Sequence, residues 1–308
     1  MLRFLLRRIL FEALPTLLVL VTLTFLLIRL APGGPFAAEV NVPPEVLAAV
    51  QAKYRLDQPL WQQYLGYLGD LLQGDFGPSL KYKDFSVNDL LRTALPVSMR
   101  IGLCAFVLAV VLGVATGLLA AVRQNGWLDH LLMGAATLGL VVPNFVLAPV
   151  LTLVFAVWLK LLPAGGWEGG RPLMMVLPVA VLCLHYLAVI ARLTRSSMIE
   201  VLASPFIRTA RAKGLPRGYI LRRHALRPAL LPVLSYLGPA LVGILTGSIV
   251  VETFFGLPGL GQLFINGALN RDYALVLALT LLVGTLTVAF NTVVDLLYGW
   301  IDPRMRIK

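Results

Sequence analysis

The sequence predicts an all-α polytopic membrane protein with six transmembrane helices. Hydrophobic residues make up 58% of the chain and charged residues only 13%, with a mean hydropathy of +0.84. A soluble domain of 308 residues does not have such a composition. Apolar stretches that are near or above the roughly 20 residues needed to cross the hydrocarbon core recur along the chain. They cover residues 9–30, 97–122, 131–159, 173–191, 229–251 and 273–300.

The first stretch follows a basic N-terminus. Arg3, Arg7 and Arg8 precede an apolar run that ends near Leu30, and a secretory signal peptide opens in the same way. The run is longer than the apolar region of a typical signal peptide, and the sequence at 31–33, Ala-Pro-Gly, does not resemble a cleavage site. We therefore predict that residues 1–30 form a cytoplasmic N-terminus and an uncleaved first span.

Residues 31–96 are more polar and are predicted to form an extracytoplasmic helical segment. Apolar residues recur at helical spacing from Trp61 to Leu72, which predicts an amphipathic helix. Ser86 and Asp89 resemble a capping box that opens another helix. Two interpretations remain open: a small cap that contacts a partner, and a solvated linker that lies on the bilayer.

The distribution of basic residues sets the orientation of the remaining segments. Nine Lys and Arg residues lie between Arg192 and Arg227, and more lie at both ends of the chain. The positive-inside rule therefore places both termini, the loop 192–228 and the tail 301–308 in the cytoplasm, with 97–300 as a five-span core. The net charge of +11 then indicates contact with anionic lipid and not with nucleic acid.

No residue pattern in the sequence predicts catalysis, a metal site or a cofactor. Cys104 and Cys183 lie in apolar runs without CxxC spacing, and we expect both to be buried small hydrophobic residues. The phosphate-binding loop of ATPases and the nucleophile elbow of hydrolases do not occur in the chain. His185 and Tyr186 lie deep in the fourth span, where they either line a cavity or form an interhelical hydrogen bond.

The loop 192–228 contains a sequence typical of a short, capped helix. Ser204 offers a hydroxyl that can cap free N–H groups, and Pro205 suits the first helical position. Gly214 and the Leu-Pro pair after it provide the stop, which leaves a helix of roughly nine residues, about 13 Å long. The spacing places Phe206, Ile207 and Ala210 on one apolar face that a second protein is expected to bury.

This loop resembles the cytoplasmic signature loop of ABC-importer permeases, E-A-A-x3-G-x9-I-x-L-P. Ala210, Gly214 and Leu226 match that form, whereas Arg208 stands at the position of the usual Glu. The variant R-T-A-R-A-K-G-L, followed by R-H-A-L, is typical of the peptide-importer branch. Further matches occur at 29–33 (RLAPG), 74–79 (GDFGPS), 81–84 (KYKD), 124–125 (QN), 246–253 (TGSIVVET), 256–264 (GLPGLGQLF), 266–273 (NGALNRDY) and 302–304 (DPR).

Along almost its whole length the chain is similar to the B-type permease subunits of oligopeptide and dipeptide ABC importers. The resemblance implies the type I ABC importer permease fold, in the bacterial cytoplasmic (inner) membrane. It also implies a homologous C-type permease subunit, two cytoplasmic ABC ATPases that bind the ATP, and an extracytoplasmic peptide-binding protein. The helix in the loop would be the coupling helix that docks on one ATPase, although the role of Arg208 in place of Glu does not transfer.

The resemblance also assigns expected roles to particular residues. The ATPase-coupling loop would comprise Ser204, Pro205, Phe206, Ile207, Arg208, Thr209, Ala210, Arg211, Lys213, Gly214 and Leu215. A tight outer loop that faces the binding protein would contain Gly256, Pro258, Gly259 and Gly261, the alternative being an ordinary reversal between spans.

Two questions about function remain open at the level of sequence. Dipeptides, nickel chelates and oligosaccharides are alternative cargoes within the importer family, because the binding protein does much of the selection. An ion-coupled secondary transporter is the rival outside it, but such proteins need coupling-ion sites at mid-membrane and commonly show internal repeats. The sequence shows no clear repeat and few charges in its spans.

Overall fold

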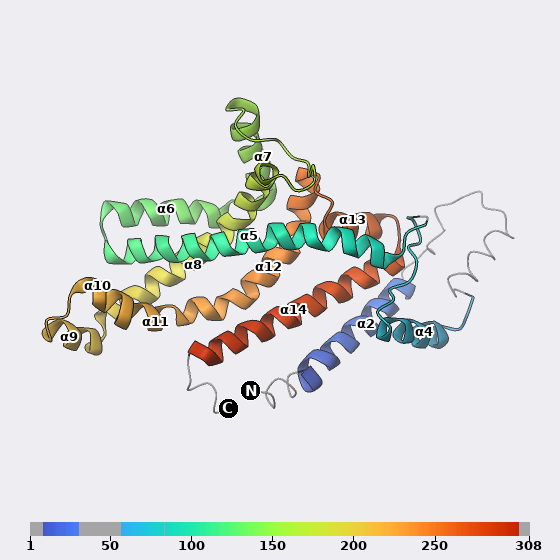
Figure 1. Ribbon diagram of the computed structural model, residues 1–308, viewed down its shortest axis with the longest axis horizontal. Helices are drawn as coiled ribbons and strands as arrows, with labels where there is room; N and C mark the ends of the chain where they lie inside the picture. The colour runs from blue at the N-terminus through green and yellow to red at the C-terminus, as the bar shows by residue number, and fades with distance from the viewer. Residues whose placement is uncertain (1–8, 31–56, 83, 302–308) are drawn as a thin grey trace. The chain divides into compact units, whose positions relative to one another are not determined.

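The computed structural model describes residues 9–30, 57–82 and 84–301, which form a succession of helices (Figure 1). The N-terminal arginines, residues 31–56 of the predicted outer segment and the tail after residue 301 lie outside the described residues. The chain divides into two compact units. Met1–Pro96 and Pro258–Leu286 form the first, and Val97–Leu257 and Thr287–Lys308 form the second.

The first unit contains the N-terminal apolar helix, among other helices. Its elements are the π-helical turn η1 (Ile9–Ala13), α2 (Leu14–Leu30), α4 (Leu60–Leu72), α13 (Leu260–Leu269), and the first parts of α5 (Val87–Val122) and α14 (Tyr273–Ile301). The predicted amphipathic helix is thus confirmed as α4, which contacts α2 through a 2.6 Å hydrogen bond between the hydroxyls of Tyr64 and Thr22. The ring of Phe25 packs edge-on against that of Tyr64.

The start of α5 confirms the predicted capping box. The backbone N–H of Ser86 donates to the Asp89 carboxylate at 3.2 Å, and the N–H of Asp89 donates to the Ser86 hydroxyl oxygen at 3.1 Å. Nearby, the buried Asp272 carboxylate accepts hydrogen bonds from the Ser79 hydroxyl and from the N–H of Leu275 in the first turn of α14. These bonds tie the segment before α5 to the start of α14.

The second unit is built around α8 (Pro172–Ala203), which packs against α6 (Trp127–Val141) and α12 (Leu231–Phe255). After α8 the chain forms several short elements, which gather at the end of that helix (Figure 1). They are α9 (Pro205–Ala212), α10 (Arg217–Tyr219), the π-helical segment η3 (Ile220–Ala225) and α11 (Leu226–Ala229).

Five helices among the described residues are long and apolar enough to cross a membrane: Leu10–Leu27, Val87–Val122, Pro172–Ala203, Leu231–Phe255 and Tyr273–Val294. The stretch 131–159, expected as one more span, bends by 110° between α6 and the pair α7 (Asn144–Thr152) and η2 (Leu153–Trp158). A proline disfavours helical conformation in the residue before it, and Val142, before Pro143, is extended. Counted as one broken span, this pair brings the total to six.

Glycines allow α8 to lie close to its neighbours. A Cβ atom at Gly113 of α5 would come within 2.8 Å of the Ile190 side chain, and one at Gly139 of α6 within 3.1 Å of the Leu184 carbonyl oxygen. Cys183 of α8 is buried as expected, but Cys104 of α5 is exposed, so the prediction of two buried cysteines was wrong for Cys104. Its apolar surroundings in the sequence are those of a surface that faces lipid.

Candidate functional site

The helix predicted in the basic loop is α9, Pro205–Ala212, which has eight residues and lies at the end of α8. Its stop is built as the sequence predicts. Gly214 adopts the left-handed conformation with φ +76°, and the N–H of Leu215 donates to the Ala210 carbonyl at 3.4 Å. The last carbonyls of the helix are thereby partly satisfied within the chain.

The start of α9 differs from the expectation. Ser204 is extended, but its hydroxyl makes no capping bond to α9 and instead donates to the Val201 carbonyl of α8 at 2.5 Å. The prediction that this hydroxyl caps free N–H groups was therefore wrong. Because α8 ends where α9 begins, the hydroxyl satisfies a terminal carbonyl of the preceding helix. Pro205, which has no N–H, reduces the need for a cap.

The apolar face of α9 is buried by the chain itself. Ile207 is 0% and Ala210 is 7% exposed, and both belong to one hydrophobic cluster. The other buried members of this cluster, here called the loop cluster, are Ala121, Met198, Ile220, Ala225 and Ala229. Phe206 is 49% exposed and lies off this face, so the three residues do not share it as predicted. Of these three residues, Phe206 is therefore the one that is accessible from outside the chain.

The outward side of α9 is rich in cations. Arg208, Arg211 and Lys213 are exposed, and so are Pro205, Thr209 and Gly214, whereas Ser204 and Leu215 are half-buried. The Thr209 hydroxyl donates back to the Pro205 carbonyl at 3.1 Å. The arrangement combines one anchored face with a surface of one aromatic ring and three positive charges, which is suited to an acidic groove on another protein.

His185 and Tyr186 lie on α8 and are half-buried. Their rings are in edge-to-face contact, with centroids 5.2 Å apart. The Tyr186 hydroxyl lies against Gly243 of α12, where a Cβ atom would collide with it. Whether this pair lines a passage remains a prediction.

The glycine-rich segment after α12 divides into a turn and a helix start. At Gly256, with φ +64°, the N–H of Leu257 donates to the Glu252 carbonyl at 2.8 Å, the bond that defines a Schellman motif. Pro258 is exposed and Gly259 precedes α13. Gly261 lies inside α13 and is buried, so its expected place in an outer loop was wrong.

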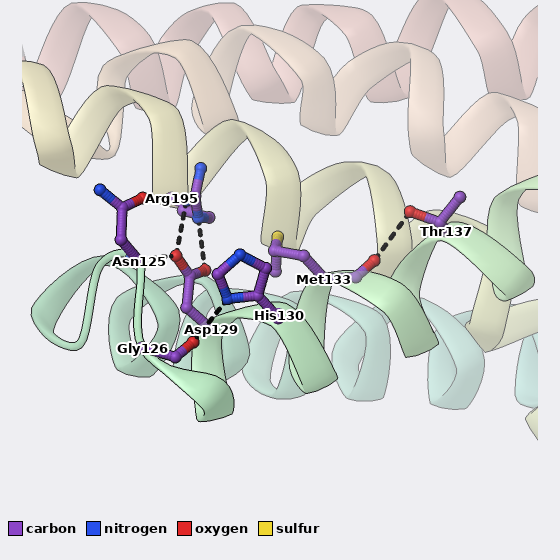
Figure 2. Close-up of polar contacts among 7 residues, drawn as sticks. All are labelled: Asn125, Gly126, Asp129, His130, Met133, Thr137 and Arg195. Atoms are coloured by element: carbon purple, nitrogen blue, oxygen red, sulfur yellow. Dashed lines mark hydrogen bonds and ion pairs between the residues drawn. The ribbon is translucent and has the colours of Figure 1, made fainter.

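Two interactions of charged residues were not anticipated from the sequence. Asp129 in the first turn of α6 accepts two hydrogen bonds of 2.6 Å from the Nε and terminal nitrogen of Arg195 on α8 (Figure 2). The carboxylate also accepts a 2.9 Å bond from the N–H of Asn125, a turn residue with φ +62°. In α12, the fully buried Glu252 accepts a 2.6 Å bond from the Ser98 hydroxyl of α5. Spacing in one sequence cannot reveal either pair, because their members lie 66 and 154 residues apart.

Comparisons with known proteins match transport-system membrane proteins along almost the whole chain. Residues 113–307 match the family described as binding-protein-dependent transport system inner membrane component, and residues 1–81 match the N-terminal region of such membrane components. Oligopeptide transport system permease protein OppB of Haemophilus influenzae is 61% identical over 99% of this chain and 100% of its own length. OppB of Escherichia coli is 60% identical with the same coverage.

More distant similarities extend the comparison. Dipeptide transport system permease protein DppB of Bacillus subtilis is 46% identical over 95% of this chain and 94% of its own length. A chain of the inward-facing MetNI methionine ABC transporter is 18% identical and superposes with a TM-score of 0.56, covering 69% of this chain and 96% of that one. That likeness shows a shared fold. On these matches, the chain belongs to the family of binding-protein-dependent transport system inner membrane components.

Proposed function

We propose that this chain is a transmembrane permease subunit of an ATP-driven importer, and that its cargo is oligopeptides. The observation that carries the proposal is the 61% identity to an oligopeptide permease over 99% of the chain. With a homologous C-type permease it forms the pathway. An extracytoplasmic binding protein delivers the peptide, and two cytoplasmic ATPases supply the energy.

In this proposal α9 is the coupling helix. Its buried face, with Ile207 and Ala210 in the loop cluster, holds it to the permease, and its exposed face docks on an ATPase. Phe206 supplies the apolar anchor, and Arg208, Arg211 and Lys213 face the acidic rim of the groove. Both termini and the loop 192–228 then lie in the cytoplasm, in accordance with the positive-inside rule.

The test is to co-express the chain with its partner permease and ATPases and to compare Phe206→Ala with Phe145→Ala. Phe145 is 64% exposed on α7 and provides the same truncation outside the loop. We expect Phe206→Ala to lower both ATPase retention on purification and ATP-dependent peptide uptake in vesicles, while Phe145→Ala retains them. Uptake that follows an ion gradient without any bound ATPase would refute the importer and favour a secondary transporter.

Dipeptides are a second candidate cargo, favoured by the 46% identity to a dipeptide permease. Competition between labelled oligopeptides and dipeptides for uptake, measured with the importer's own binding protein, distinguishes the two. Oligopeptide uptake that dipeptides fail to inhibit would support the first assignment.

A further inference from the structure

The interface between α6 and α8 holds an ion pair with the geometry of a clamp. Asp129 is 2% exposed, and the Arg195 guanidinium grips both of its oxygens at 2.6 Å (Figure 2). Bidentate pairs of this kind fix orientation as well as distance. Removing Arg195 would leave the buried Asp129 carboxylate without its charged partner, which makes the pair costly to break from that side, whereas the Arg195 side chain is 27% exposed.

The pair is close to α9 along the chain. Arg195 precedes the last residue of α8, Ala203, by two helical turns, or about 12 Å of helix. Between these two positions Met198 joins the loop cluster that buries Ile207 and Ala210 of α9. A displacement of α9 therefore reaches the cytoplasmic part of α8 through packed side chains as well as through the backbone.

Close packing at small residues joins α8 to α5, another of its neighbours. Gly113 of α5 lies against Ile190, and Ala121 at the end of α5 belongs to the loop cluster. On α6, Gly139 packs closely against α8 near the bend at Pro143. The opposite end of α6 is held to α8 by Asp129. The ion pair thus joins the first turn of α6 to α8, and further along α6 the Arg192 guanidinium of α8 donates a weaker, exposed hydrogen bond of 3.1 Å to the Thr137 hydroxyl.

We propose that Asp129 and Arg195 are positioning residues that clamp α6 to α8, so that motion delivered to α9 moves both helices as one body. The inference rests on the proposed function as an ATP-driven permease. It assigns the pair to coupling, the conversion of ATP hydrolysis into transport. Neither residue needs to contact the peptide or the ATPase.

The test replaces the ion pair by a covalent link in the complete complex, reconstituted in proteoliposomes. In a parent with Cys104→Ala and Cys183→Ala, the double variant Asp129→Cys, Arg195→Cys is assayed for peptide imported per ATP hydrolysed. We expect a roughly tenfold fall, the factor that corresponds to about 1.4 kcal/mol. A short bifunctional thiosulfonate reagent should restore the ratio to within about twofold of the parent, and reduction should abolish the gain.

A cross-linked protein that still fails to import would show that α6 and α8 must move apart, and would overturn the proposal. So would normal import by the unlinked variant. If the parent itself shows no ATP-dependent peptide import, the proposed function fails, and the clamp fails with it. The parent's own activity therefore separates the two failures.

If the cysteine variant folds poorly, a variant with two uncharged side chains in place of the ion pair distinguishes an effect on coupling from an effect on stability. Asp129→Asn with Arg195→Gln removes both charges and is expected to retain more heat stability than either single change. Its ratio of peptide to ATP should nevertheless stay low, whereas a purely structural role predicts that the ratio recovers with stability. Glu168→Gln with Arg171→Gln, which removes an exposed ion pair, is the matched control and should leave the ratio unchanged.

Discussion

The close contact between α5 and α8 makes a specific prediction for Gly117. A methyl group there would lie 2.6 Å from Cβ of Thr194 and would also collide with the backbone carbonyl of Ala191. A carbonyl in the middle of a helix cannot rotate away. Gly117→Ala must therefore push α5 and α8 apart, which also loosens the neighbouring contact of Gly113 with Ile190.

The expected magnitude follows from two opposing effects. Overpacking lowers the free energy of unfolding by about 1–3 kcal/mol, whereas exchanging Gly for Ala in a helix raises it by about 0.5–1 kcal/mol. Gly134→Ala in α6 is the matched control, because a Cβ atom at Gly134 meets no atom within 4 Å. Since both variants gain the same helix propensity, the difference between them is the overpacking cost, about 1–3 kcal/mol.

The assay compares the two variants in detergent by the fraction of monodisperse protein left after heating. At about 2–4 °C per kcal/mol, Gly117→Ala should lose its native elution peak at a temperature roughly 2–12 °C below that of Gly134→Ala. If Gly117→Ala is as stable as Gly134→Ala, the helices are not in the close contact described. Gly117→Leu should then be tolerated as well.

Three further predictions concern other parts of the chain. In detergent, N-ethylmaleimide should modify the exposed Cys104 faster than the buried Cys183, as followed by mass spectrometry; equal rates would contradict their placement. Ser86→Ala should cost about 1 kcal/mol in a thermal scan, because it removes half of a capping box. Ser98→Ala should cost about 1.5–3 kcal/mol, because buried Glu252 loses a hydrogen bond to its carboxylate, whereas Ser196→Ala on an exposed surface of α8 should change little.

Much of the fold could be predicted from composition and local sequence. A helix that crosses hydrocarbon must satisfy its own backbone groups, so long apolar stretches specify spans without knowledge of their neighbours. The start and end of α9 could also be predicted from nearby residues, because Pro205 and Gly214 act through the backbone conformations they favour. The capping box at Ser86 is formed by residues only three positions apart.

What could not be predicted depends on tertiary contacts. Helical spacing indicates which residues lie near each other on α9, but whether Ile207 or Phe206 faces the protein depends on where the chain after Pro216 returns. The Gly-x-x-x-Gly pattern at 113 and 117 was a readable signal for close helix packing, although only the structure identifies α8 as the partner. Nothing in the sequence around Asp129 indicates that it pairs with Arg195, 66 residues away.

Two of the contacts of α8, one with α5 and one with α6, fix its position in different ways. Gly113 and Gly117 allow α5 to pack closely against α8. In a membrane, however, apolar packing alone does little to favour one alignment of the two helices over another. The Asp129–Arg195 pair depends on direction and distance, so it specifies how α6 is set against α8. Both contacts end on the same stretch of α8, because Gly117 meets Ala191 and Thr194, the residue before Arg195. Sites that share such a stretch are coupled, so the combined stability cost of Gly117→Ala and loss of the ion pair should differ from the sum of the two single costs. A combined cost equal to the sum would show that α5 and α6 contact α8 independently.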